Sequence, residues 1–232
     1  MSPAASGDHP GPLRLSYGAE LEQLRLQTEV MGLRVDQNLE RMRQVLTTGD
    51  TVIAAQALAA DDEIDAMNVS LTERCYEVLA RETPVASDLR LVVSVIRATS
   101  ELERVGDLSL RVVKAALDHE LLMSSPRSFD ILCVMADEAI AMFRDAIRAW
   151  GTDDLELATR LATCPHPTDL AYAQLVDCLV HLEGPDAAAI AMQALLAGQA
   201  LDRITDHAAI LGTRLRYLLT GDPTHLAAEV RR

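Results

Sequence analysis

The hexapeptide "LERVGD" at residues 102–107 returns as "LDRITD" at residues 201–206, near the end of the 232-residue chain. Both copies read Leu, acid, Arg, β-branched residue, any residue, Asp. Sliding one half of the chain over the other by 99 residues, from Glu103 to Asp202, aligns the two copies and much of the helical pattern around them. We therefore predict two copies of one structural unit.

Composition favours helices over strands. Hydrophobic residues make up 49% of the chain, which is enough to bury a core in a protein of this length. Ala, Leu, Arg and Glu, which prefer helices, are plentiful, whereas aromatic residues, which favour strands, make up only 3%. The predicted fold class is all-α.

Six long helices are predicted from apolar residues that recur every three or four positions, the spacing of one helix face. Grouped in threes, they form two tandem three-helix bundles related by a pseudo-twofold internal repeat. The fifth helix is either continuous or broken, because "CPHP" at residues 164–167 interrupts it. The predicted helices cover residues 15–47, 51–80, 84–117, 127–150, 153–181 and the segment from "EGPD" (183–186) to residue 220.

Short signals set the predicted helix ends. Asp50 is an acidic start for the second helix, and Thr83 is a plausible N-cap that puts Pro84 at the first position of the third. Glycines are predicted to stop the first, fourth and sixth helices. These glycines are Gly49, Gly151 and Gly221.

Breaks in the pattern divide the chain into four parts. "HELLMSSPRS" at residues 119–128 loses the helical period and is the predicted connection between the repeats. The N-terminal stretch has no apolar run, so neither a signal peptide nor a membrane anchor is expected, and the predicted location is the cytoplasm. The predicted parts are a disordered tail (1–13), a first repeat (14–121), a second repeat (122–222) and a C-terminal tail (223–232).

The charge of the chain argues against two classes of partner. A formal net charge of −14 repels phosphate backbones and anionic membranes, and no basic stripe interrupts it. Neither nucleic-acid binding nor membrane insertion is expected.

The four cysteines form no Cys-x-x-Cys pair, so reduced structural cysteines are predicted.

Pairs of carboxylates mark the repeated hexapeptide. Residues four apart lie on one face of a helix, so Glu103 with Asp107, and Asp202 with Asp206, each place two negative charges side by side. Such pairs also arise by chance in an acidic chain, as solvated surface charge. Their return in the third helix of each repeat favours a function, because a cation bound by carboxylate oxygens would remove the repulsion.

The preceding helix offers the opposite wall of the first site. Asp61 and Asp65 in "DDEID" are again four apart, so carboxylates from two adjacent antiparallel helices would surround more than one ion. At the matching place in the second half, Asp169 aligns with Asp65, but Pro165 aligns with Asp61. The second site has therefore lost a ligand.

Two histidines lie near the second site in the sequence. His166 belongs to the "CPHP" break, where it has no defined partner, and His207 follows Asp206 but points about 100° round the helix from it. We interpret both as bystanders rather than metal ligands.

The chain shows no sequence motif typical of an enzyme. It lacks the Glu-x-x-His spacing of di-iron helical bundles, and it has no P-loop, GxGxxG fingerprint or GxSxG elbow. No nucleophile stands beside a general base. No catalytic residue is predicted, and we expect the protein to act by contact with other proteins.

The chain resembles the PhoU-type phosphate-uptake regulators, a family built from two tandem three-helix repeats. The resemblance covers residues 15–221 and rests on "DDEID", on "ELERVGD" and "LDRITDHA", and on "YLLTGD" at residues 217–222. It implies that acid-x-x-x-Asp motifs line metal-binding faces, with iron, zinc or magnesium as the ions. Position by position, the implied ligands are Asp61, Asp65, Glu103 and Asp107 in the first site, and Asp169, Asp202 and Asp206 in the second.

The same resemblance implies a function and partners. The function is negative regulation of the phosphate-starvation response, by an adaptor that contacts a membrane sensor histidine kinase and the ATP-binding subunit of the high-affinity phosphate transporter. A homodimer is compatible with this role. Two other readings stay open: an enzyme with a carboxylate-bound metal cluster, and a metal-free helical scaffold.

Overall fold

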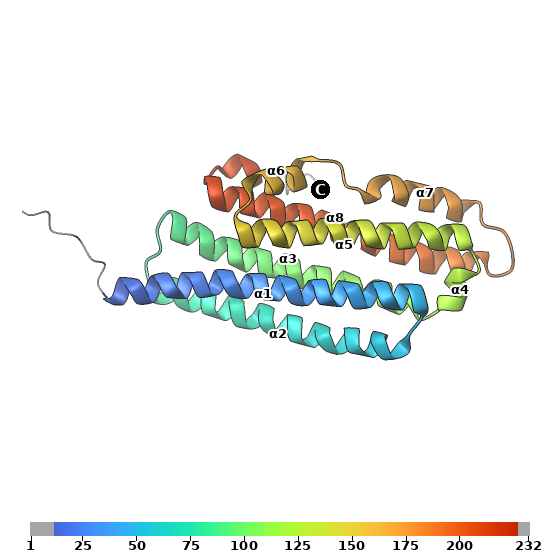
Figure 1. The fold of residues 1–232 in the computed structure, drawn as a ribbon, viewed down its shortest axis with the longest axis horizontal. Helices are drawn as coiled ribbons and strands as arrows, with labels where there is room; N and C mark the ends of the chain where they lie inside the picture. Colours follow the sequence, from blue (N-terminus) through green and yellow to red (C-terminus); the bar gives the residue numbers. More distant parts are fainter. Residues whose placement is uncertain (1–11, 227–232) are drawn as a thin grey trace, which may run out of the picture.

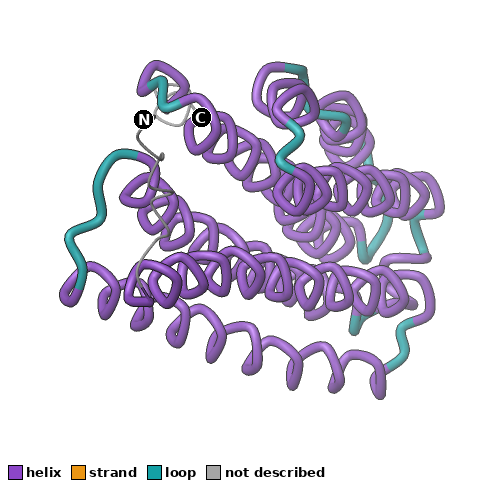
Figure 2. Tube along the Cα trace, turned by 60° about the vertical axis from the view of Figure 1, so that its left-hand side comes forward, coloured by secondary structure: helices purple, strands orange, loops and turns teal. Residues whose placement is uncertain are grey.

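The computed structural model describes residues 12–226, in which every regular element is a helix (Figure 1, Figure 2). The all-α prediction is thus confirmed. None of the described helices is long and apolar enough to cross a membrane. The eight α-helices are α1 (Pro12–Thr48), α2 (Thr51–Arg81), α3 (Ser87–Ala116), α4 (His119–Met123), α5 (Pro126–Thr152), α6 (Leu155–Thr163), α7 (Thr168–Val180) and α8 (Ala187–Thr220).

Two inner helices, α3 and α8, carry the repeated hexapeptides and make the most extensive helix–helix contact. Helices α1 and α2 pack on α3, while α5, α6 and α7 pack on α8, and α1 also lies against α5. Figure 1 shows α1 and α2 along the lower side of the bundle and α5, α6 and α7 along the upper side. The boundary expected between the two repeats, after residue 121, stays a prediction.

Buried apolar side chains from both halves of the chain form one continuous core. Met31 of α1, Leu102 of α3, Phe143 of α5 and Leu201 of α8 all belong to it, each at most 1% exposed. Burying a side chain of this size is worth about 1.5–3 kcal/mol. The apolar helix faces seen in the sequence therefore hold the bundle together.

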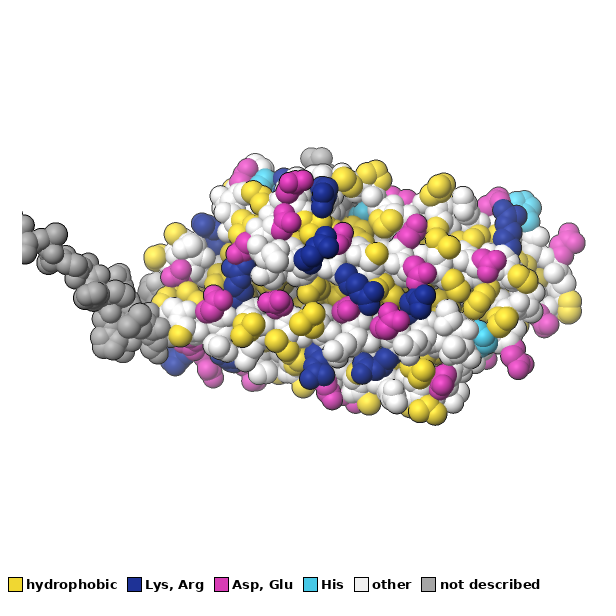
Figure 3. All heavy atoms as spheres, viewed as in Figure 1, with side chains coloured by type: hydrophobic (Ala, Val, Ile, Leu, Met, Phe, Trp, Pro, Cys, Tyr) yellow, Lys and Arg dark blue, Asp and Glu magenta, His cyan; other side chains and the backbone are white. Residues whose placement is uncertain are grey.

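Ion pairs join the surfaces of α1 and α5. Arg43 Nε lies 2.5 Å from Asp137 Oδ1, and Arg144 Nε lies 2.7 Å from Asp36 Oδ1. Figure 3 shows basic and acidic side chains next to one another on this face. Exposed pairs of this kind contribute only about 0–1 kcal/mol each, so they add little to the packing beneath them.

Several predicted helix ends are confirmed. Gly49 follows α1 with φ +67°, a left-handed conformation that favours glycine, and Gly221 follows α8 with φ +72°. Asp50 caps α2, because its Oδ1 accepts hydrogen bonds from the backbone N–H groups of Val52 and Ile53 at 2.8 and 3.1 Å.

The predicted start of the third helix is wrong. α3 begins at Ser87, and no side chain caps it. Thr83 and Pro84 lie instead in the connection that leads from α2 to α3. Ala86, directly before the helix, has φ +47°.

The predicted stop at Gly151 is also wrong. α5 runs through this glycine to Thr152, and the left-handed residue after it is Asp153, with φ +54°. Gly151 faces α1 instead, where an added Cβ would lie 2.7 Å from Glu29 Oε1. An aspartate, which tolerates the left-handed conformation, therefore ends the helix in place of the glycine.

The fifth predicted helix takes the broken form and is divided into α6 and α7. Pro165 and Pro167 lack the backbone N–H that a helix needs, and Cys164 before them is extended. Figure 1 shows α6 and α7 following one another along the same side of the bundle. The short α4 lies in the predicted connection between the repeats.

The predicted tails are described only in part. Residues 1–11 and 227–232 lie outside the described residues. Within the described range, α1 already begins at Pro12, and residues 223–226 form a short 3₁₀ turn after α8.

Candidate functional site

Helices α2 and α3 bring the four carboxylates of the first predicted site together. The two helices are packed on one another. The pKa of Asp61 is raised to about 6 by burial and then by the nearby carboxylates of Asp65, Asp107 and Glu103. Carboxylates raise one another's pKa only when they are close. These four residues form what we call the α2–α3 acidic face.

Asp61 is the buried member of this face. Its side chain belongs to a residue that is only 7% exposed, and its Oδ1 has no hydrogen-bond partner among the described residues. A buried carboxylate without a partner costs several kcal/mol if it is charged, unless it takes up a proton or a cation. The raised pKa of Asp61 means that, without a cation, its carboxylate takes up a proton more readily than a free aspartate does.

Gly106 allows Asp61 to approach α3. A Cβ added to Gly106 would lie 2.7 Å from Asp61 Oδ1, closer than such atoms normally come. A glycine inside a helix costs about 1 kcal/mol of stability relative to alanine. The close approach of Asp61 explains why a glycine occupies this position despite that cost. Gly106 was not among the predicted site residues, although a glycine within a helical pattern is itself a signal of close approach.

The rim of the face is open to solvent. Asp65 and Asp107 are exposed, while Glu103 is partly buried. Burial and then Asp107 raise the pKa of Asp65, and burial followed by Asp107 and Asp65 raises that of Glu103. A cation can therefore reach the face from water on one side and meet Asp61 on the other.

The donors of this face suit a hard cation, which prefers carboxylate and carbonyl oxygens. Asn68, one turn beyond Asp65 on α2, adds an amide Oδ1 that is buried without a partner among the described residues. No three His, Cys, Asp or Glu side chains within residues 12–226 already surround a common ion position. The residues therefore fit such an ion in kind, and coordination would require the carboxylates to move toward a common position.

In the second half, hydrogen bonds occupy the acidic pair. Thr168 Oγ1 donates to Asp202 Oδ1 at 2.8 Å and lies 3.1 Å from Thr205 Oγ1. Thr205, which takes the place of Gly106 in the repeat, donates to the backbone oxygen of Asp202 at 2.6 Å. Burial raises the pKa of Asp202, and the Thr168 hydrogen bond opposes that rise. A hydroxyl donor thus faces Asp202 where the first half has carboxylates.

His166 completes this second group, which corrects its interpretation as a bystander. Its Nδ1 lies 3.4 Å from Asp206 Oδ1 and 3.3 Å from Thr205 Oγ1, because the proline break turns its ring toward α8. Asp169 Oδ2 accepts a hydrogen bond from the His166 backbone N–H at 3.1 Å. We call Thr168, His166, Asp169, Asp202, Thr205 and Asp206 the α7–α8 network.

Replacing Thr168 with Val tests this network. The change keeps the shape of the side chain but leaves Asp202 Oδ1 without its donor, so we expect the free energy of unfolding to fall by about 1–2 kcal/mol. Chemical denaturation followed by circular dichroism measures it. Thr168→Ser, which retains the hydroxyl, should stay close to wild type. Equal stability of the Val variant and wild type would contradict the role given to this hydrogen bond.

His207 is a buried link between the two inner helices. Its Nδ1 lies 2.6 Å from Glu101 Oε2 of α3, and both side chains are largely buried, with 8% and 16% exposed. It therefore lies at the α3–α8 contact, within the core, and its interpretation as a bystander rather than a metal ligand stays a prediction.

Comparison with known proteins places these features in a family. A family model, PhoU domain, matches residues 28–116. The phosphate-specific transport system accessory protein PhoU homolog of Pseudomonas putida is 30% identical over 92% of this chain and 84% of its own length. The crystal structure of PhoU from Pseudomonas aeruginosa has a TM-score of 0.82 and 30% identity, covering 89% of this chain and 100% of that one. The phosphate transport system regulatory protein PhoU from Streptococcus pneumoniae follows at 0.76 and 25%, covering 89% and 98%. The chain belongs to the PhoU family.

Proposed function

We propose that this protein is a non-catalytic accessory protein of a phosphate-specific transport system, and a negative regulator of phosphate uptake and phosphate-starvation signalling. The observation that carries the proposal is the similarity to an accessory protein of such a system over 92% of the chain. The fold likeness to a phosphate transport regulatory protein adds to it. Accessory and regulatory proteins act through contacts with other proteins, which agrees with a sequence that carries no recognised catalytic motif.

The proposed partners are the ATP-binding subunit of the phosphate transporter and the cytoplasmic region of a sensor histidine kinase. An adaptor that contacts both would couple the state of the transporter to the kinase. A cytoplasmic location follows from these partners. The resemblance of the two hexapeptides to the motifs of phosphate-uptake regulators supports this finer assignment.

The α2–α3 acidic face is the metal site in this proposal. Asp61, Asp65, Glu103 and Asp107 would hold a hard cation, with iron or magnesium fitting the oxygen-only donors better than zinc. A bound cation would offset the burial of Asp61 and fix α2 against α3. It would also leave the rim of the face able to bridge to a partner's carboxylates.

The second predicted ligand set is proposed to bind metal weakly. Thr168 and His166 already occupy oxygens of Asp202 and Asp206, and Asp169 accepts a backbone hydrogen bond. An ion would have to replace these contacts, which reduces its net gain. We therefore expect the first site to fill before the second.

Gly106→Ala is expected to lower metal affinity while leaving the stability of the fold nearly unchanged. Alanine gains about 1 kcal/mol of helix propensity, but its Cβ displaces the Asp61 carboxylate, so we expect the free energy of unfolding without metal to stay within about 1 kcal/mol of wild type. Metal affinity, measured by calorimetric titration, should fall at least about tenfold. Gly18→Ala is the control, because a Cβ there meets nothing within 4 Å. Unchanged metal affinity in Gly106→Ala would count against the assigned site.

A binding assay tests the proposed function. Purified protein would be passed over the immobilised transporter ATP-binding subunit and the immobilised cytoplasmic region of the kinase, with divalent cation or with chelator. We expect wild type to bind both, and Asp61→Asn/Asp107→Asn to bind more weakly in the presence of the cation. Asp62→Asn/Glu63→Gln, which removes two exposed charges next to the face, is the control. If wild type binds neither partner under any condition, the adaptor function is wrong.

A further inference from the structure

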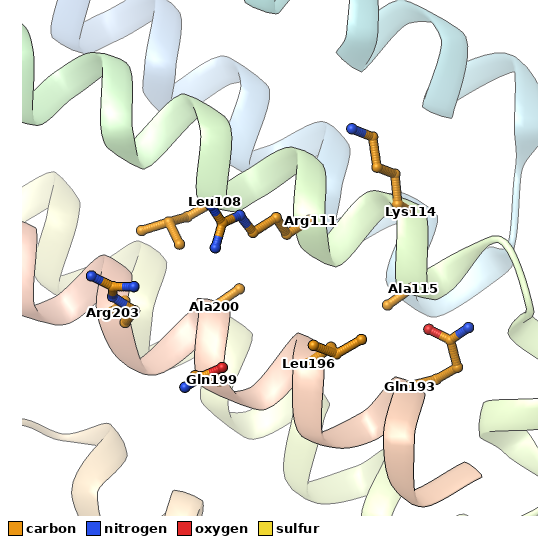
Figure 4. A pocket seen from close by; sticks show the side chains of 9 residues that line it. All are labelled: Leu108, Arg111, Lys114, Ala115, Gln193, Leu196, Gln199, Ala200 and Arg203. Atoms are coloured by element: carbon orange, nitrogen blue, oxygen red, sulfur yellow. The ribbon is translucent and has the colours of Figure 1, made fainter. Parts of the chain in front are cut away.

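A pocket of about 330 Å³ lies between the two inner helices, and none of the predicted metal ligands lines it (Figure 4). α3 supplies Arg111 and Lys114 to its walls, and α8 supplies Arg203. Figure 4 shows the guanidinium groups of Arg111 and Arg203 toward the same end of the pocket, one from each wall, whereas the Lys114 side chain extends from α3 away from α8. Cations from the two halves of the chain therefore face one space.

These cations have no acidic partner among the described residues, a state that they share with several other arginines. Acidic residues outnumber Lys and Arg by 35 to 21, and arginines on α1 and α5 are paired across the helix contact. None of the ion pairs among the described residues involves Arg111, Lys114 or Arg203. Even Asp107, one turn from Arg111, lies beyond ion-pair distance from it. Facing cations without counter-charges repel one another unless an anion lies between them.

The remainder of the lining suits a ligand with an uncharged part. Leu108, Ala115, Leu196 and Ala200 give an apolar floor, and Gln193 and Gln199 add amide donors and acceptors. Ligand pockets typically measure about 300–1,000 Å³, so this one fits a small molecule rather than a chain. Inorganic phosphate alone would leave the apolar floor uncovered.

The geometry points to a binding site for a small organic phosphate in this α3–α8 pocket. Its phosphate lies between Arg111 and Arg203, where planar guanidinium groups donate paired hydrogen bonds to phosphate oxygens. Its organic part covers the floor formed by Leu108 and Leu196. Because the two arginines belong to different halves of the chain, the bound ligand ties α3 to α8. This site is independent of the metal site and of the proposed partners.

Calorimetric titration of the full-length protein tests the site. The probes are adenosine monophosphate, adenosine triphosphate, inorganic phosphate and adenosine. We expect a nucleotide to bind, adenosine without a phosphate not to bind, and inorganic phosphate to bind at least about tenfold more weakly than the nucleotide. Arg111→Gln/Arg203→Gln should weaken nucleotide binding at least about tenfold.

The matched control is Arg34→Gln/Arg41→Gln, which removes the same charge from a different pocket, of about 270 Å³ between α1 and α2. This variant should bind the nucleotide as wild type does. An equal loss in both double variants would show a general charge effect and overturn the site. So would absence of binding by either nucleotide at millimolar concentration, or equal binding of inorganic phosphate. Circular dichroism confirms that each variant is folded.

Discussion

Asp61→Asn is expected to stabilise the metal-free protein at neutral pH by about 2–3 kcal/mol. Asparagine keeps the size of the side chain but removes a charge that is buried beside three other carboxylates. The pKa of Asp61 is about 6 in the folded protein against 3.8 for the free group, and each pH unit of such a difference is worth about 1.4 kcal/mol. Urea denaturation in the presence of chelator measures the change.

The pH dependence fixes the sign of this effect. Because the pKa of Asp61 is raised in the folded state, between about pH 4 and pH 6 the folded protein keeps a proton on Asp61 that the unfolded chain has lost. The free energy of unfolding therefore falls as pH rises through that window. The advantage of Asp61→Asn should therefore be absent near pH 4 and complete above about pH 7. Asp62→Asn, which removes an exposed neighbouring charge and leaves Asp61 in place, should keep the fall in stability between about pH 4 and pH 6. A variant no more stable than wild type at neutral pH would contradict the burial of a charged Asp61.

His207→Ala is expected to destabilise the protein by about 2–4 kcal/mol. The change leaves Glu101 Oε2 in a largely buried position without its partner and opens a cavity between α3 and α8. Thermal and chemical unfolding measure the loss. His181→Ala, at an exposed histidine that also contacts a carboxylate, should change stability by less than about 0.5 kcal/mol.

A double-mutant cycle with Glu101→Ala assigns the loss to the pair. If the buried contact is responsible, the double variant should lose clearly less stability than the sum of the two single variants. Additive losses would mean that His207 acts through packing alone. The result matters for the whole bundle, because this contact joins the two inner helices that carry the repeated hexapeptides.

The sequence was most informative where its signals are local or repeated. The three-residue and four-residue apolar spacing predicted the helices, since each buries one face, and Met31 and Leu102 lie in the core as that spacing requires. The acid pairs at Asp61 and Glu103 were found because spacing of four places both carboxylates of a pair on one face. Packing of α2 on α3 then brings the pairs together.

Features that depend on tertiary contacts were not predictable in the same way. Gly151 looks like a helix stop, but α5 continues through it, and the left-handed residue that ends the helix is Asp153. The place of His166 against Asp206 depends on how the proline break folds back over α8, which no spacing in the sequence records. The hydroxyl of Thr168 was missed for the same reason.

Metal analysis of the purified protein tests the central claim most directly, that the α2–α3 acidic face is the metal site of this PhoU-family protein. Protein made without a chelating tag would be equilibrated with iron, magnesium, manganese or zinc, dialysed and measured by mass spectrometry. We expect wild type and Asp202→Asn/Asp206→Asn to retain metal and Asp61→Asn/Asp107→Asn to lose it. Metal-free wild type under all four conditions, or loss only in Asp202→Asn/Asp206→Asn, would contradict the claim.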